Sequence, residues 1–264
     1  MLGIFVTAIT IISALFVFFG AISDFWSMVS NIPFIQRQKF NEEQREVIAN
    51  YLKADNYYQN LSIEGKNKFI NRLIRFMVNK EFEGREGLTV TEEMKVEISA
   101  SAIRLTFGLD QFILPNFDTI WIFPEIFVFG LDRLKMKGGT TPGGRVMLSW
   151  KDFISGNANP TDRINLGLHE FAHALKIEVA DGDEFDKRFT AFYPEWEKAG
   201  TVEMMRMRSK KSAVLREYAS ANINEFFAVS VEHFFERPAE LKSLLPELYN
   251  HFVWLLNQDP LNTL

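Results

Sequence analysis

The segment LHEFAHALK, residues 168–176, carries His169 and His173 with Glu170 directly after the first histidine. Its apolar neighbours and the absence of a helix breaker predict a helix. Side chains four residues apart lie on one face of a helix with Cβ atoms about 6 Å apart, so both imidazoles can reach one zinc ion at about 2.1 Å. Glu170 projects to the side of that pair, where it can take a proton from a zinc-bound water. The pattern therefore predicts zinc-dependent hydrolysis.

The same pattern also arises by chance in helices that bind no metal. Here the polar residues stand in an apolar helix, which contains Leu166, Leu168, Phe171, Ala172 and Leu175. Burying histidine and glutamate without partners is costly. This context favours a metal site over a histidine pair in an ordinary core.

Composition narrows the ligands that a metal could have. The chain has 264 residues, of which 47% are hydrophobic, so it can form one large domain or two small ones. It contains no cysteine and only four histidines, two of them in the opening segment, so any metal must be held by His, Asp or Glu. The formal net charge is −5 and no basic stripe is present, so no nucleic-acid partner is predicted.

The N-terminus carries a separate signal. Residues 2–22 are uncharged, and as a helix they would be about 31 Å long, close to the thickness of a bilayer core. A cleaved signal peptide would have a basic start and a small-residue cleavage site, and a core helix would be apolar on one face only. We therefore expect a single-pass anchor in a bacterial inner membrane. Arg37 and Lys39 follow the run, which favours a cytoplasmic catalytic domain.

The predicted organisation is a transmembrane anchor at residues 1–30 and a zinc-dependent catalytic domain at residues 31–264. Periodicity and capping residues predict mostly helices in the second part, while two β-rich stretches predict a small sheet. The helices are expected at residues 42–54, 61–82, 91–107, 162–177, 183–198, 222–236, 239–244 and 247–256. The strands are expected at 119–129, broken by Pro124, and at 145–150. The segment KGGTTPGG, residues 137–144, reads as a turn-rich loop.

A catalytic zinc usually has three protein ligands and one water, so one ligand is missing from the opening segment. The tract YASANINEFFAVSVEHFF, residues 218–235, supplies Glu225 and, seven residues later on the same helical face, Glu232. His233 would point about 100° away from Glu232. Spacing favours Glu225 because Asn222 can cap and fix its helical turn. Glu232 and His233 would otherwise lie behind the ligands or on the surface.

The run NLGLHEFAHAL and the tract YASANINEFFAVSVEHFFERP resemble the Mlc titration factor A family of zinc-dependent peptidases, which in turn look like the catalytic domain of anthrax lethal factor. The resemblance extends over most of residues 40–260. It implies that His169, His173 and Glu225 bind one Zn²⁺ ion and that Glu170 is the general base. It also implies that Tyr218 donates a hydrogen bond to the developing oxyanion.

The predicted elements give an α+β fold, mostly helical with a small sheet, and the resemblance implies that this is a zincin-type domain. The transmembrane helix through residues 2–22 is predicted from its uncharged sequence alone. The implied activity is hydrolysis of a peptide or protein substrate, with aminopeptidase and endopeptidase action both open. The alternative is a regulator that binds and sequesters a protein partner such as a transcriptional repressor. Two departures stand out: soluble family members lack the N-terminal run, and Ala174-Leu175-Lys176 replaces the Lys-Leu-Asp that often follows the second histidine.

Overall fold

The computed structural model describes residues 42–130, 133–180, 185–210 and 214–262. The chain divides into two compact units, residues 1–45 and 46–264, and the second contains the sheet and the motif helix. The predicted membrane helix at residues 2–22 lies outside the described residues. None of the helices that are described combines the length and the apolar character needed to cross a bilayer.

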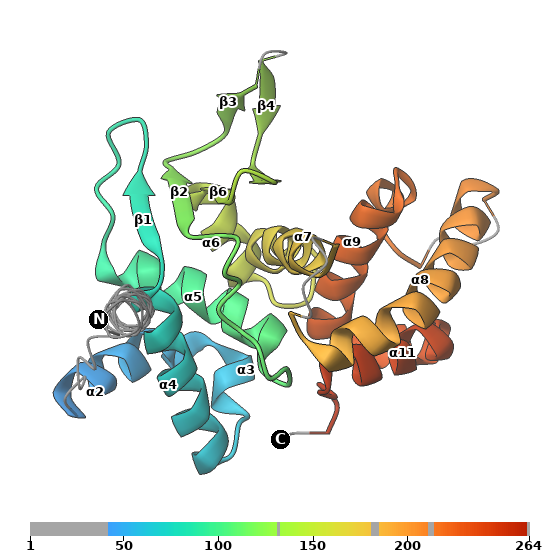
Figure 1. The fold of residues 1–264 in the computed structure, drawn as a ribbon, viewed down its shortest axis with the longest axis horizontal. Coiled ribbons are helices and arrows are strands. Elements are labelled where there is room, and N and C mark those ends of the chain that lie inside the picture. Colours follow the sequence, from blue (N-terminus) through green and yellow to red (C-terminus); the bar gives the residue numbers. More distant parts are fainter. Residues whose placement is uncertain (1–41, 131–132, 181–184, 211–213, 263–264) are drawn as a thin grey trace, which may run out of the picture. The chain divides into compact units, whose positions relative to one another are not determined.

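A four-stranded sheet with the order β1-β2-β6-β5 lies beside the motif helix. Strands β1 (Glu81–Gly84), β2 (Thr119–Phe123) and β6 (Arg145–Ser149) are parallel, and the edge strand β5 (Gly138–Thr141) is antiparallel to β6. A hairpin of β3 (Phe127–Phe129) and β4 (Leu134–Met136) extends from the end of β2 (Figure 1). Parallel strands need a crossover, and helix α5 (Glu92–Thr106) makes the first one, between β1 and β2.

The motif helix α7 (Leu166–Ala180) packs between this sheet, α5 and α9 (Ile223–Glu236). Small residues at 100–102 are buried on α5. The approach of α5 to α7 is close: a Cβ added at Gly167 would lie 2.6 Å from Ser101 Oγ. Glycine at this position therefore lets α7 dock onto α5 and sets where the histidines lie.

Aromatic residues join α9 to two other helices, α8 (Lys187–Arg208) and α11 (Pro246–Leu256). The Trp196 and Phe227 rings meet edge to face with centroids 4.8 Å apart, and Phe252 lies 5.7 Å from Phe227. Each of these three side chains is fully buried. Aromatic pairs of this kind add about 0.5–1.5 kcal/mol beyond their buried area, so α9 is held firmly on the side away from the sheet.

The remaining helical segments complete this mostly helical α+β unit, so the coarse fold prediction is confirmed. They are α2 (Glu42–Tyr51), η1 (Leu52–Ala54), α3 (Asn56–Gln59), α4 (Ile63–Val78), α6 (Trp150–Ala158), η2 (Glu217–Ser220) and α10 (Pro238–Leu244).

Several local predictions were wrong. The KGGTTPGG segment contains strand β5 rather than only loop, the helix expected to reach residue 82 ends at Val78 before β1, and α6 begins at Trp150 where strand was expected. Helix α6 begins because the Ser149 hydroxyl accepts a hydrogen bond from the Asp152 amide. The motif helix also begins at Leu166 rather than near residue 162.

Candidate metal centre

Helix α7 presents His169 and His173 on one face, as their spacing predicted. Asn165 precedes the helix, and its Oδ1 accepts a hydrogen bond from the Leu168 amide at 3.0 Å, which fixes the first turn. The two imidazole rings have centroids 4.8 Å apart, and their Nε2 atoms lie 3.2 Å from each other. The two side chains are mostly buried, and the short distance between their Nε2 atoms shows that both nitrogens face the same position beside the helix.

Glu225 reaches the same position from α9. The Asn222 side chain accepts hydrogen bonds from the Asn224 and Glu225 amides at 2.9 and 3.0 Å, so the predicted cap is present. Glu225 Oε2 lies 3.1 Å from His169 Nε2 and 3.5 Å from His173 Nε2. The structure thus brings together three residues that are separated by up to 56 positions in sequence.

We call His169, His173 and Glu225 the metal tripod, and its geometry fits zinc. Two ligand atoms bound at about 2.05 Å with a tetrahedral angle lie about 3.4 Å apart. The three separations within the tripod, 3.1, 3.2 and 3.5 Å, scatter about that value. Two imidazoles and one carboxylate are also a ligand set of catalytic zinc sites, and the tripod leaves a fourth position for water.

The electrostatics of the tripod favour a cation. Burial alone would lower the pKa of the His169 imidazole, but hydrogen bonds with Glu225 and Glu232 outweigh burial and raise it to about 10. Burial likewise opposes ionisation of Glu225, and the two imidazoles overcome it and hold the pKa of that carboxyl well below its usual range. Since zinc binds neutral imidazole, metal uptake must release protons from this cluster.

Glu232 lies behind His169 rather than in the tripod. Its Oε1 lies 2.8 Å from His169 Nδ1 and also contacts Arg216, while its Oε2 accepts a hydrogen bond from the Asn165 amide at 2.6 Å. The Glu232 side chain is 1% exposed. A carboxylate on the outer nitrogen of a ligating histidine fixes the tautomer and the ring orientation. Nothing in the sequence pointed to Arg216, because its role depends on a contact with α9.

Substitution of Glu232 by glutamine is expected to weaken zinc binding by about 10- to 100-fold, the usual cost of losing an outer partner of a histidine ligand. The variant keeps the side-chain shape but loses the charge that holds His169 and Arg216. Competition with a chromophoric chelator measures the affinity, and circular dichroism checks the fold. An unchanged affinity in a folded variant would contradict the role given to Glu232.

His233 does not reach the tripod. It is 1% exposed, and its Nε2 lies 3.3 Å from Glu240 Oε2 on the next helix. Burial lowers the pKa of His233 to about 4, with the nearby Glu240 opposing the shift. His233 is therefore a core residue of α9 and is not placed to bind the metal.

Glu170 faces the sheet edge beside the tripod. The Thr140 hydroxyl on β5 lies 3.0 Å from Glu170 Oε2, and a Cβ added at Gly138 would meet Glu170 Oε1 at 2.5 Å. Burial raises the pKa of Glu170, and the two tripod imidazoles oppose that rise. Gly138, which reads as a turn signal, is thus a strand residue that makes room for Glu170. The contact of Thr140 with Glu170 could not be predicted from the sequence, because it depends on the pairing of β5 with β6.

Tyr218 stands at the open side of the centre. It lies on η2, its ring centroid is 6.2 Å from that of His169, and its side chain is 55% exposed. Burial of part of the phenol, together with the nearby Glu225 carboxylate, raises the pKa of Tyr218. A protonated phenol at this place is available as a hydrogen-bond donor.

Comparisons with known proteins agree with the resemblance. The family described as glucose-regulated metallo-peptidase M90 matches residues 26–255. An uncharacterised protein of Synechocystis is 27% identical over 73% of this chain and 76% of its own length. Mlc titration factor A of Yersinia pestis and of Yersinia pseudotuberculosis are each 24% identical over 84% of this chain and 89% of their own length. The chain therefore belongs to the glucose-regulated metallo-peptidase M90 family.

Proposed function

We propose that the protein is a zinc-dependent peptidase, with His169, His173 and Glu225 as the zinc ligands. The observation that supports this best is that the ligand atoms of the tripod lie 3.1–3.5 Å from one another. Glu170, the residue after His169 on the same helix, places a carboxylate beside them. When bound, zinc would supply a Lewis acid that polarises the scissile carbonyl and lowers the pKa of water. The absence of cysteine is consistent with this His and Glu ligand set.

Glu170 would take the proton of the attacking water and deliver it to the leaving amine. Its 5% exposure and its raised pKa suit a group that must accept a proton and release it again. The hydrogen bond from Thr140 holds the carboxylate in one orientation. Tyr218 would donate a hydrogen bond to the oxygen of the scissile carbonyl as negative charge develops there.

The location of this activity is also a proposal. The uncharged run of residues 2–22 supports a single-pass membrane anchor, and Arg37 and Lys39 after it support a cytoplasmic catalytic domain under the positive-inside rule. In this arrangement residues 31–264 would form the peptidase domain next to the inner membrane.

The direct test uses the purified full-length protein with one equivalent of zinc. A mixture of peptides, each present with a free and with an acetylated N-terminus, is incubated with it and analysed by mass spectrometry. Cleavage that a chelator abolishes and zinc restores is the expected result. Cleavage of the peptides with a free N-terminus but not of the acetylated ones would identify an aminopeptidase. Cleavage of both sets would identify an endopeptidase. No cleavage of any peptide by the zinc-loaded protein would count against the proposal.

A second candidate function is sequestration of a protein partner, which the relatives named Mlc titration factor A favour. In this case binding of Mlc, rather than hydrolysis, would be the activity. A Glu170→Gln variant separates the two: if binding is the function, this variant should bind purified Mlc and act in the cell as the parent does. A variant that loses the cellular effect while still binding Mlc would support hydrolysis.

Substitution of Tyr218 by phenylalanine is expected to lower kcat for peptide hydrolysis by about 10²–10³-fold, the usual effect of removing one oxyanion donor. Zinc content should not change, because the phenol is not a ligand. Tyr193→Phe is the matched control, since the Tyr193 hydroxyl bonds Glu197 on α8, away from the tripod. A Tyr218→Phe enzyme with the parent kcat would remove Tyr218 from the mechanism.

A further inference from the structure

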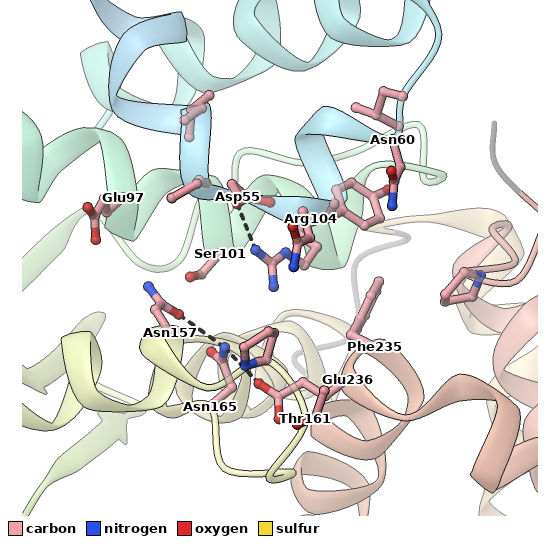
Figure 2. A pocket seen from close by; sticks show the side chains of 18 of the residues that line it. Asp55, Asn60, Glu97, Ser101, Arg104, Asn157, Thr161, Asn165, Phe235 and Glu236 are labelled. Atoms are coloured by element: carbon pink, nitrogen blue, oxygen red, sulfur yellow. Dashed lines mark hydrogen bonds and ion pairs between the residues drawn. The ribbon is translucent and has the colours of Figure 1, made fainter.

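A cavity of about 610 Å³ lies at the N-terminal end of α7 and the C-terminal end of α9, where Asn165, Phe235 and Glu236 line it. Its volume is in the range of small-molecule sites. None of the tripod residues lines it, and its walls come from segments far apart in sequence, as Figure 2 shows. These segments are residues 51–61, 97–104, 157–165, 235–238 and 258–260.

The charged groups of this cavity are mostly acidic. Its lining contains one basic side chain, Arg104, and four acidic ones, Asp55, Glu97, Glu236 and Asp259. Arg104 already donates to Asp55 Oδ2 at 2.7 Å. In the described part of the chain, no salt bridge joins Glu97 or Glu236 to a basic side chain. The cavity therefore has negative charge that its own residues do not neutralise.

Glu236 is the most buried of these acids, with 8% of its surface exposed. Its Oε1 accepts a hydrogen bond from Asn165 Nδ2 at 3.2 Å, and Figure 2 shows this contact at the cavity wall. Its Oε2 has no hydrogen-bond partner among the described residues. A buried acceptor without a donor is costly, so a donor group in the cavity would relieve it.

Burial raises the pKa of Glu236 to about 7, although the hydrogen bond from Asn165 opposes the shift. Glu232 on the same helix and Asp162 on the preceding loop raise it further. The carboxyl would therefore ionise fully at neutral pH only if a positive charge came close.

Glu97 lies on α5, so it comes from a different wall of the cavity. Burial raises its pKa to about 7 as well, with smaller contributions from Glu93 and Asp55 in the same direction. A hydrogen bond with Asn157 of α6 acts in the opposite direction. Two acids on separate elements thus line the cavity with pKa values raised by burial, and a cation in the cavity would favour the ionised form of both.

Apolar surface completes the cavity. Phe235, Leu61 and three prolines, at positions 160, 238 and 260, line it beside the polar residues. Such walls suit the apolar body of a ligand, while a few polar groups fix its orientation.

We propose that this cavity binds a small organic cation, an ammonium group on an apolar body, with Glu236 as the acceptor of the ammonium and Glu97 as a second acidic group on another wall. The ammonium donates the hydrogen bond that Glu236 Oε2 lacks, and the apolar body lies against Phe235 and the prolines. The site is separate from the metal tripod, so the proposal does not depend on peptide hydrolysis.

The test is isothermal titration of the full-length protein with phenethylammonium chloride, 2-phenylethanol and 3-phenylpropionate. These probes share one ring and differ in charge. We expect the ammonium to bind at least about 10-fold more tightly than the alcohol, and the carboxylate not to bind. A charge-assisted hydrogen bond contributes this much or more. Binding must persist in a chelator, because a free amine could also coordinate zinc.

Variants locate the site. Glu236→Gln and Glu97→Gln should each weaken phenethylammonium binding by about 10-fold, and Glu247→Gln, an exposed acid on α11, should leave it unchanged. Three results would overturn the proposal: equal affinity for the alcohol, tighter binding of the carboxylate, or no binding of any probe. Wild-type affinity in both cavity variants would do so as well, since each variant removes one carboxylate from the cavity wall.

Stability against pH gives an independent check on Glu236. Its pKa in the folded protein lies above the unfolded value, so the cost of its charge is present in full above pH 7 and disappears as pH falls toward 4.5. Glu236→Gln should therefore raise Tm by about 5 °C at pH 8 and by less than about 2 °C at pH 5.5. A shift of the same size at both pH values would show that the carboxyl is not perturbed.

Discussion

Substitution of Glu170 by glutamine is expected to lower kcat/KM for peptide hydrolysis by about 10³-fold, within the range that a general base contributes. The amide has the shape of the carboxylate but cannot accept a proton. Thr140 can still donate to its oxygen, so the side chain should keep its place against β5. Zinc content should remain at one equivalent, because Glu170 is not a tripod residue. Kinetics with a fluorogenic peptide and elemental analysis measure the two quantities.

Glu178→Gln is the matched control for this variant. Glu178 is also a buried acid on α7, but its Oε1 accepts a hydrogen bond from the Asn116 amide at 2.6 Å, away from the tripod. The control should hydrolyse the peptide within about twofold of the parent rate, since it leaves the proton acceptor in place. If Glu170→Gln also keeps the parent rate, Glu170 is not the base.

Substitution of Glu225 by alanine is expected to weaken zinc binding by more than about 100-fold, beyond the cost of losing an outer partner. The change leaves two imidazoles on α7 and removes the only ligand that α9 supplies. Hydrolysis should fall with the bound zinc and recover in part when zinc is in large excess. Equilibrium dialysis followed by elemental analysis gives the affinity.

The control for this variant is Glu217→Ala, an exposed acid on η2 close to the centre. It should bind zinc as the parent does. A Glu225→Ala protein with unchanged zinc occupancy would move the third ligand to another residue, and Glu232, 2.8 Å from the other side of His169, would be the first to examine.

Local spacing was enough to predict the histidine pair and the cap of α9, because both depend on helical geometry alone. His169 and His173 share a face because they are four residues apart, and Asn222 caps because it directly precedes an apolar helical run. Burial of Asn165 and contact between Arg216 and Glu232 depend instead on how α7 packs against α9. No local pattern in the sequence encodes that packing.

The segment around Thr140 shows why local signals failed at the sheet edge. Its glycines and proline are typical of turns, yet Gly138 and Gly139 pair with Leu148 and Met147 of β6. Pairing with a neighbouring strand outweighed the weak strand propensity of glycine. The glycine at position 138 is needed because α7 passes so close to the strand. Such a requirement is visible only once strand and helix are placed together.

The central claim is that one zinc ion binds to the tripod beside Glu170, and anomalous diffraction at the zinc edge tests it most directly. Crystals of the full-length protein grown with one equivalent of zinc would be measured on both sides of the edge. We expect a single peak about 2.0–2.2 Å from His169 Nε2, His173 Nε2 and a Glu225 carboxylate oxygen. A peak bound to Glu232, or no peak between α7 and α9, would contradict the claim.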